Sequence, residues 1–199
     1  MNLVSFPEAE FFLEIVVDSI TPWLAGIIKN QKDKKILDIG TGAGIPGIPL
    51  AIVLDRISFH LLDSKKKKID FVHQVKQELK LSNVETHCER VEVFALKNLR
   101  SFDMVVSRAV GEIVVLLEYA APLLKLGGKL ILYKGEKTVE ELEKARKAID
   151  LLGFNEPDIF KYELNEQKRR TLLVFSKIFE TPEGFPRKPG MATKKPLVK

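Results

Sequence analysis

The sequence predicts an α/β protein built on a doubly wound, mostly parallel β-sheet, and two observations support this. Residues 35–50 read KILDIGTGAGIPGIPL, in which a short apolar segment runs into glycines at three alternate positions and then into a helix start. Further along, apolar segments of strand length alternate with amphipathic segments of helical period. Because parallel strands need crossover connections, this alternation is typical of a sheet with helices on both faces.

The first elements follow from periodicity and from the positions of proline. Residues 8–30 place apolar side chains at helical spacing, and Pro22 is expected to break this helix. The first strand is expected at 36–39. A helix at 46–54 follows it, because proline fits a first helical turn. The second strand is expected at 57–62, and its apolar run ends at an aspartate.

The middle of the chain continues this alternation. Residues 65–79 carry apolar side chains on one helical face, which indicates an amphipathic helix. A short third strand is expected at 84–88 and a fourth at 102–107. An apolar helix at 113–124 leads to the fifth strand at 129–133, which follows two glycines.

The end of the predicted sheet differs from its beginning. A helix at 138–152 closes at Gly153, since glycine commonly ends helices. Strands at 159–164 and 171–176 then pair as a hairpin around a charged turn. The chain is therefore expected to form an N-terminal helical segment packed on the core, a Rossmann-like domain, and a basic arm rich in proline, at residues 1–34, 35–180 and 181–199.

Composition limits the class of protein. With 199 residues and 45% hydrophobic content, the chain is long enough for one domain with a real core, and we expect a monomer. Cys88 is the single cysteine, which excludes an internal disulfide and fits the cytoplasm. The N-terminus lacks the basic and apolar regions of a signal peptide. The longest uncharged run, residues 39–54, is too short and too rich in glycine and proline for a membrane span.

The positive charge is concentrated at the C-terminus. Residues 181–199 hold five basic side chains against Glu183, a net charge of +4 out of +5 for the chain. Such a segment is typical of an arm that contacts nucleic acid, and the alternative is a terminus that only aids solubility. The late turn adds two arginines. The candidates for RNA binding are Arg169, Arg170, Arg187, Lys188, Lys194 and Lys195.

The glycine turn and a later aspartate indicate an adenosine-containing cofactor. Asp63 lies 23 residues beyond Gly40, at the end of the second strand, where a carboxylate can accept hydrogen bonds from ribose hydroxyls. The alternative is a helix N-cap. The spacing Gly40-x-Gly42-x-Gly44 departs from the G-x-G-x-x-G pattern of dinucleotide sites. It is similar instead to the turn of class I methyltransferases, which hold S-adenosylmethionine.

Several chemistries are disfavoured by the residues present. Residues 106–109 read VSRA and lack the Asn/Asp-Pro-Pro-aromatic motif of many exocyclic-amine methyltransferases. Cys88 is expected on a strand as a small core residue, so it is a poor candidate for a thiolate nucleophile. One cysteine with scattered His60, His73 and His87 predicts no metal site, and His73 is expected to be a partly exposed bystander.

Seven segments carry a more specific resemblance: LDIGTGAGIPGIPL (37–50), LLDS (61–64), FVHQVKQELKL (71–81), RVE (90–92), FDMVVSRA (102–109), KG (134–135) and FPRKPG (185–190). Together they resemble the RsmG (GidB) family, which methylates N7 of a guanine in bacterial 16S rRNA. The resemblance implies S-adenosylmethionine as cofactor and 16S rRNA or the small ribosomal subunit as partner. The family segment His-Phe-Leu-Asp-Ser stands here as IVVDS at 15–19.

The resemblance also implies roles for individual residues. Arg108, at the end of the fourth strand, would face the site of methyl transfer. The ribose would meet Asp63 and Ser64, with Lys65 beside them. The cofactor-binding residues expected from the turn and the resemblance are Gly40, Gly42, Gly44, Ile45, Asp63, Ser64, Lys65, Val91, Glu92 and Arg108.

Guanine N7 carries an in-plane lone pair, so it needs no deprotonation before it attacks a methyl group. We therefore expect no general base, and catalysis by alignment of the reacting atoms. Arg108 and Lys134 are candidates for orienting the acceptor, and the alternative for Arg108 is a surface salt bridge. Two other functions stay open: a methyltransferase for a small molecule or a protein, and a nonenzymatic RNA-binding module.

Overall fold

A computed structural model describes residues 12–108, 110–135, 138–165 and 168–198. Residues 1–11 of the expected N-terminal segment lie outside this part, as do Ala109 and Lys199. No described helix is both long and apolar enough to cross a membrane.

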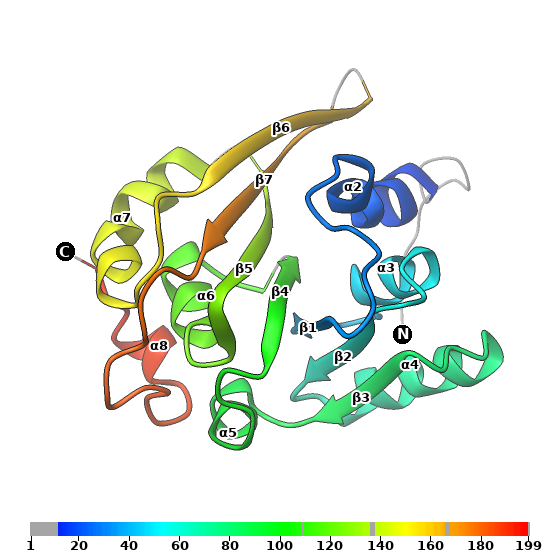
Figure 1. Ribbon diagram of the computed structural model, residues 1–199, viewed down its shortest axis with the longest axis horizontal. Coiled ribbons are helices and arrows are strands. Elements are labelled where there is room, and N and C mark those ends of the chain that lie inside the picture. The colour runs from blue at the N-terminus through cyan, green and yellow to red at the C-terminus, as the bar shows by residue number, and fades with distance from the viewer. Residues whose placement is uncertain (1–11, 109, 136–137, 166–167, 199) are drawn as a thin grey trace.

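The fold is a seven-stranded sheet in the order β3-β2-β1-β4-β5-β7-β6 (Figure 1). The first five strands of that order are parallel, and β7 runs antiparallel to both β5 and β6. Reversal of strand order between β1 and β4 creates the crevice where such sheets bind ligands. The strands are β1 Lys35–Ile39, β2 Ser58–Asp63, β3 Val84–Cys88, β4 Phe102–Arg108, β5 Leu124–Lys134, β6 Asp158–Asn165 and β7 Lys168–Ser176.

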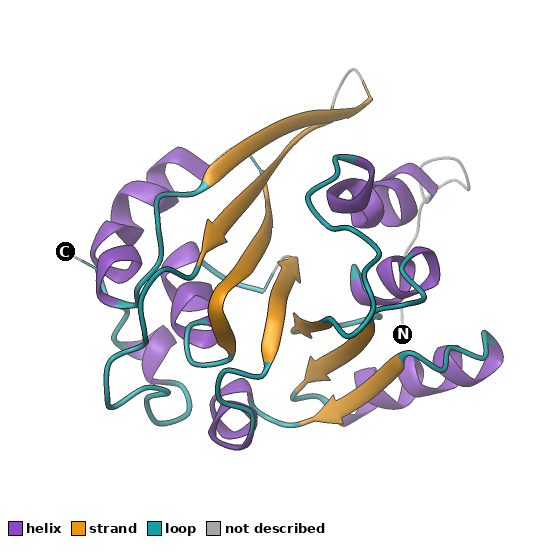
Figure 2. Ribbon diagram, in the orientation of Figure 1, coloured by secondary structure: helices purple, strands orange, loops and turns teal. Residues whose placement is uncertain are grey.

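Helices cover both faces of the sheet (Figure 2). Neighbouring residues of β1 point to opposite faces, so Leu37 joins the core under α5, α6 and α7, whereas Ile36 joins the core under α3 and α4. Full burial of each such side chain contributes about 1.5–3 kcal/mol. The helical elements are η1 Phe12–Val17, α2 Asp18–Leu24, α3 Gly47–Val53, α4 Lys66–Glu78, α5 Val91–Lys97, α6 Ile113–Ala120, α7 Thr138–Leu151 and α8 Met191–Lys194.

The doubly wound architecture is confirmed, and three local predictions were wrong. Pro22 does not break the N-terminal helix; it lies inside α2, which ends two residues later. The helix after β4 ends at Ala120, because Leu124 already pairs with Phe102 before a bulge in β5. Two short helices, α5 and α8, were missed, since segments of seven and four residues are too short to show a helical period.

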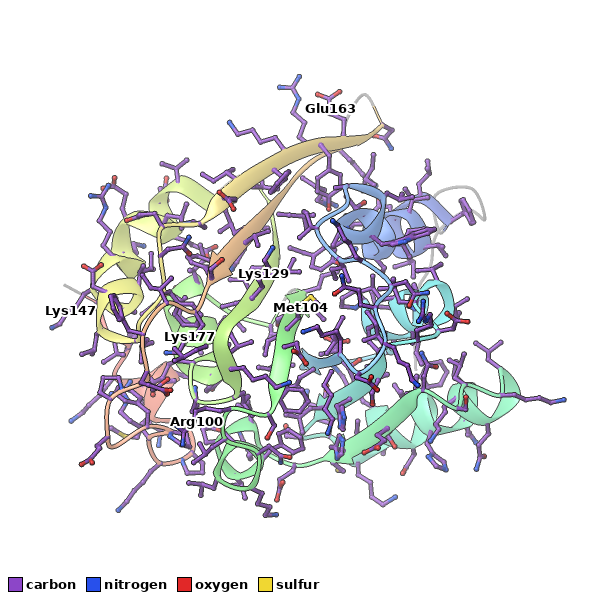
Figure 3. All side chains as sticks on the ribbon, in the orientation of Figure 1. Arg100, Met104, Lys129, Lys147, Glu163 and Lys177 are labelled. Carbon is purple, nitrogen blue, oxygen red and sulfur yellow. The ribbon has the colours of Figure 1, made fainter. Side chains whose placement is uncertain are left out.

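Charged side chains lie at both ends of the β6–β7 hairpin, and one of them is buried. Glu163 lies near the far end of the β6–β7 hairpin (Figure 3). At the other end, the side chain of Lys177 is buried, donates a hydrogen bond to the Leu152 carbonyl and lies 5.1 Å from the centre of the Phe154 ring. Burial lowers the pKa of Lys177 to about 8.

Candidate functional site

The carboxyl ends of β1 and β2 open on a cavity of about 350 Å³. Six of the predicted cofactor residues line it: Gly40, Asp63, Ser64, Lys65, Val91 and Glu92. Seven lining residues were not predicted as cofactor-binding, namely Ile39, Leu62, Lys68, Glu89, Arg90, Val110 and Tyr119. Val110 and Tyr119 approach from the segment after β4 and from α6, so only the folded sheet brings them to the glycine turn.

The glycine turn keeps its backbone close to this cavity. Gly40, Gly42 and Gly44 have φ angles of +69°, +60° and +86°, a region that side chains rarely adopt. A Cβ at Gly40 would lie 2.5 Å from Val110 Cγ2, so this position also lacks room for a side chain. Gly42, Gly44 and Ile45 shape the turn without lining the cavity itself.

Asp38, on β1, fixes the shape of the glycine turn. Its Oδ2 accepts hydrogen bonds from the Thr41 hydroxyl at 2.7 Å and from the Gly47 amide at 3.0 Å. Asp38 is fully buried, and burial raises the pKa of its carboxyl from 3.8 to about 7. The structure therefore explains why an acidic residue precedes the glycines: it ties the start of the turn to the start of α3.

Asp63 connects three parts of the site. Its carboxylate accepts hydrogen bonds from the Gly42 amide at 3.1 Å and the Lys65 amide at 2.9 Å, and Lys68 Nζ lies 3.8 Å from Oδ2. The N-cap residue of α4 is Lys65, so Asp63 does not occupy the cap position. The aspartate thus presents a negative group at the cavity and holds the glycine turn beside β2.

The C-terminal segment contacts two residues that line the cavity, Glu92 and Tyr119. Glu92 is buried, and its Oε1 accepts a hydrogen bond from the Gly190 amide at 2.6 Å. The hydroxyls of Tyr119 and Thr193 lie 3.5 Å apart. The described part of the segment therefore packs on the domain, where the sequence analysis expected an extended arm.

A second cavity, of about 320 Å³, lies beyond the ends of β4 and β5. It is lined by Asp18, Arg108, Tyr133, Lys134, Gly135 and Arg170. Arg108 Nη2 lies 3.1 Å from Oδ2 of the buried Asp18, whose other oxygen accepts a hydrogen bond from the Tyr162 hydroxyl. Burial and the nearby Asp18 carboxylate raise the pKa of Tyr162, which stays a neutral donor.

Lys134 and Arg108, the two candidates for orienting the acceptor, differ in how many of their polar atoms have hydrogen-bond partners. Lys134 Nζ donates to the Gly111 carbonyl at 2.8 Å and to Glu141 at 2.7 Å. Arg108 Nη1 is buried and has no hydrogen-bond partner within the described residues. A buried, unpaired donor costs about 1–3 kcal/mol, unless a ligand supplies the acceptor. The Arg108–Asp18 pair joins residues 90 positions apart, so the sequence alone could not reveal it.

The basic candidates fall into two groups. Three are engaged: Arg169 Nε donates to Glu163 at 3.0 Å, Arg170 Nη2 lies 3.7 Å from Glu14, and Arg187 makes a forked pair with the buried Glu118. The other three, Lys188, Lys194 and Lys195, are exposed. RNA contact by these residues stays a prediction.

Two of the residues considered for other chemistries can also be placed. Cys88 is exposed at the end of the edge strand, so the expectation of a small core residue was wrong. His73 is exposed on α4, where Nε2 lies 3.1 Å from the Gln77 amide. Neither residue lines the two cavities at the carboxyl edge.

Known proteins resemble this chain closely. A family model described as rRNA small subunit methyltransferase G matches residues 1–172. Proteins named ribosomal RNA small subunit methyltransferase G from Desulfitobacterium hafniense and Carboxydothermus hydrogenoformans are 42% and 47% identical to it over 201 and 174 residues. The alignments cover 100% and 86% of this chain, and 82% and 74% of those proteins.

Solved structures show the fold independently. A predicted O-methyltransferase from Agrobacterium tumefaciens matches with a TM-score of 0.65 at 16% identity, over 83% of this chain and 81% of that one. A SAM dependent methyltransferase from Aquifex aeolicus matches with a TM-score of 0.60 at 14% identity, over 86% of this chain and 100% of that one. At such identities the likeness concerns the fold alone, which is that of class I methyltransferases.

Proposed function

The chain belongs to the rRNA small subunit methyltransferase G family, and from this we propose that it transfers a methyl group from S-adenosylmethionine to N7 of a guanine in 16S rRNA. The observation that carries the proposal is the pair of cavities at the carboxyl edge of the sheet. One is lined by Gly40 and Asp63, and the other by Arg108.

The first cavity fits the cofactor. Asp63 offers a carboxylate to the ribose hydroxyls, and its charge also attracts Lys68. Apolar side chains of Leu62 and Val91 line the same space and suit an adenine ring. Gly40 leaves the backbone bare where a Cβ would meet Val110. When bound, S-adenosylmethionine supplies an electrophilic methyl group on its sulfonium sulfur.

The second cavity suits the acceptor base. Guanine presents O6 beside N7 on one edge, and arginine is well shaped to donate to that edge. Arg108 Nη1 is a donor without a partner in the described part of the chain, and Asp18 fixes Nη2. A single donor at Nη1 directed to O6 orients the base and leaves the N7 lone pair free to attack the methyl group, and N7 has no proton to lose first. Lys134, which donates a hydrogen bond to Glu141, lines the same cavity.

The same proposal covers the contact with RNA, the cellular compartment and the oligomeric state. Exposed Lys188, Lys194 and Lys195 lie on the C-terminal segment that contacts Glu92 in the cavity wall, where they can meet RNA phosphates. We place the protein in the cytoplasm, where bacterial rRNA is made, as a monomer. Methyl transfer to a neutral lone pair needs no metal ion in the reaction itself.

Methyl incorporation tests the proposal directly. The protein is incubated with small subunits or 16S rRNA and radiolabelled S-adenosylmethionine, and the product is treated with borohydride and aniline, which cleave RNA at N7-methylguanosine. We expect label in rRNA and one cleavage site. Label in protein or in small molecules only would identify a methyltransferase of another class, and RNA binding without label would identify a nonenzymatic module.

Cofactor choice is tested separately by calorimetry with S-adenosylmethionine and with NAD. We expect S-adenosylmethionine to bind and NAD to bind far more weakly, because the turn lacks the glycine spacing of a pyrophosphate cradle. Tighter binding of NAD would overturn the cofactor assignment.

A further inference from the structure

Three potential metal ligands lie together on the edge of the sheet. The register of β2 and β3 pairs His60 with Glu85, and His87 is the next residue on the same face of β3. His60 Nδ1 lies 3.0 Å from His87 Nε2, and Glu85 Oε2 lies 3.5 Å and 3.9 Å from these two nitrogens. The sequence separates the two histidines by 27 residues, so they looked scattered there.

These distances suit a tetrahedral ion. Zinc binds imidazole nitrogen and carboxylate oxygen at about 2.0–2.2 Å, which places neighbouring ligand atoms about 3.3 Å apart. The three separations lie on both sides of that value. The Glu85 side chain is 62% exposed, so it can move by the few tenths of an ångström that closer ligation needs. Its exposure also leaves a fourth position open to water.

Aromatic packing already orients the two imidazole rings. They stack with their centres 5.2 Å apart, His60 meets the edge of Phe102, and His87 packs on Phe94. Carboxylate charge from Glu85 compensates a cation at this position.

We propose that His60, Glu85 and His87 form a site for one divalent transition-metal ion of the zinc class, which clamps β3 to β2. Both strands end beside the cofactor cavity, where Asp63 and Glu89 line its wall. The clamp therefore stabilises the sheet edge that supports this wall. None of the three residues lines either cavity at the carboxyl edge, and the proposal does not depend on the methyl-transfer function.

Zinc binding to the full chain tests the proposal. Protein stripped with a chelator is dialysed against zinc chloride, and bound metal is counted per chain. We expect one ion per chain and a rise in melting temperature with zinc, because a ligand that binds the folded state stabilises it. Cobalt in place of zinc is expected to give the strong visible absorption of a tetrahedral site.

Matched variants locate the ion. Glu85→Gln and His87→Ala are expected to weaken zinc binding by about tenfold or more, while the metal-free melting temperature of Glu85→Gln, at an exposed position, stays unchanged. His73→Ala and Cys88→Ser remove the third histidine and the one thiol, and both are expected to bind zinc as the parent does. Absence of binding by the parent protein, retention of binding in His87→Ala, or loss of binding in Cys88→Ser would each overturn the proposal.

Discussion

The Gly190 amide donates a hydrogen bond to the Glu92 carboxylate at 2.6 Å and so ties the C-terminal segment to the wall of the cofactor cavity. Other contacts also hold the C-terminal segment against the domain. Arg187 forms a forked pair with Glu118, and Phe185 and Leu197 pack against the core. A segment that is basic in sequence is thus also part of the folded domain.

Truncation after Thr181 is therefore expected to lower both the melting temperature and the affinity for S-adenosylmethionine. The deletion leaves Glu118 and Glu92 buried without Arg187 and without the Gly190 amide, and unpaired buried charges are costly. Calorimetry and thermal unfolding measure the two effects. A truncated chain with the parent's melting temperature and cofactor affinity would show that these contacts are incidental.

The role of the exposed lysines in RNA binding needs a milder change. The double substitution Lys194→Ala and Lys195→Ala keeps the docked segment, since both side chains are exposed. Each lost phosphate contact is expected to flatten the log–log dependence of RNA affinity on salt by about 0.7–0.9. Melting temperature and cofactor affinity serve as controls and should not change. An unaltered salt slope would refute RNA contact at these positions.

Asp63→Ala is expected to weaken S-adenosylmethionine binding by about 1.5–3 kcal/mol, because a charge-assisted hydrogen bond to the ribose is lost. Melting temperature should also fall, since Asp63 accepts from the Gly42 and Lys65 amides. Asp70→Ala is the control: it removes an exposed carboxylate of α4 that pairs with Lys66. Unchanged affinity per folded Asp63→Ala molecule would leave the aspartate only its structural role.

Arg108→Lys is expected to slow methyl transfer about tenfold or more while S-adenosylmethionine affinity changes little, because lysine keeps the charge but loses the planar fork. Asp18→Asn should lower the rate in the same way through loss of the 3.1 Å ion pair. Single-turnover rates on rRNA and calorimetry separate the two quantities. Equal losses of rate and cofactor affinity would place Arg108 on the cofactor.

Asp38 gives a pH dependence with a definite sign. The pKa of its carboxyl is about 7 in the folded protein and 3.8 in an exposed chain, so the folded state binds more protons between these values. Its contribution to stability is fully present below about pH 4 and is lost as pH rises through 7. The free energy of unfolding of the parent, relative to Asp38→Asn, should therefore fall over this window. A difference that is flat or rises would contradict the assignment.

The parts of the site that sequence could predict are local in the chain. The glycine turn, Asp63 and the RVE segment at 90–92 are each recognisable from a few neighbouring residues, and they meet because parallel strands end at one edge. The Arg108–Asp18 pair, the Gly190–Glu92 contact and the His60–His87 pair join residues far apart in sequence. They depend on strand register and on where terminal segments dock, which local patterns do not encode.

The buried amine of Lys177 has a use of its own. Burial beside Leu152 and Phe154 lowers the pKa of this amine and also keeps reagents away from it. An acylating label added to the native protein reaches exposed lysines first and Lys177 only when the corner between α7 and β7 opens. The rate at which Lys177 becomes labelled therefore reports how often this corner opens, and mass spectrometry measures it.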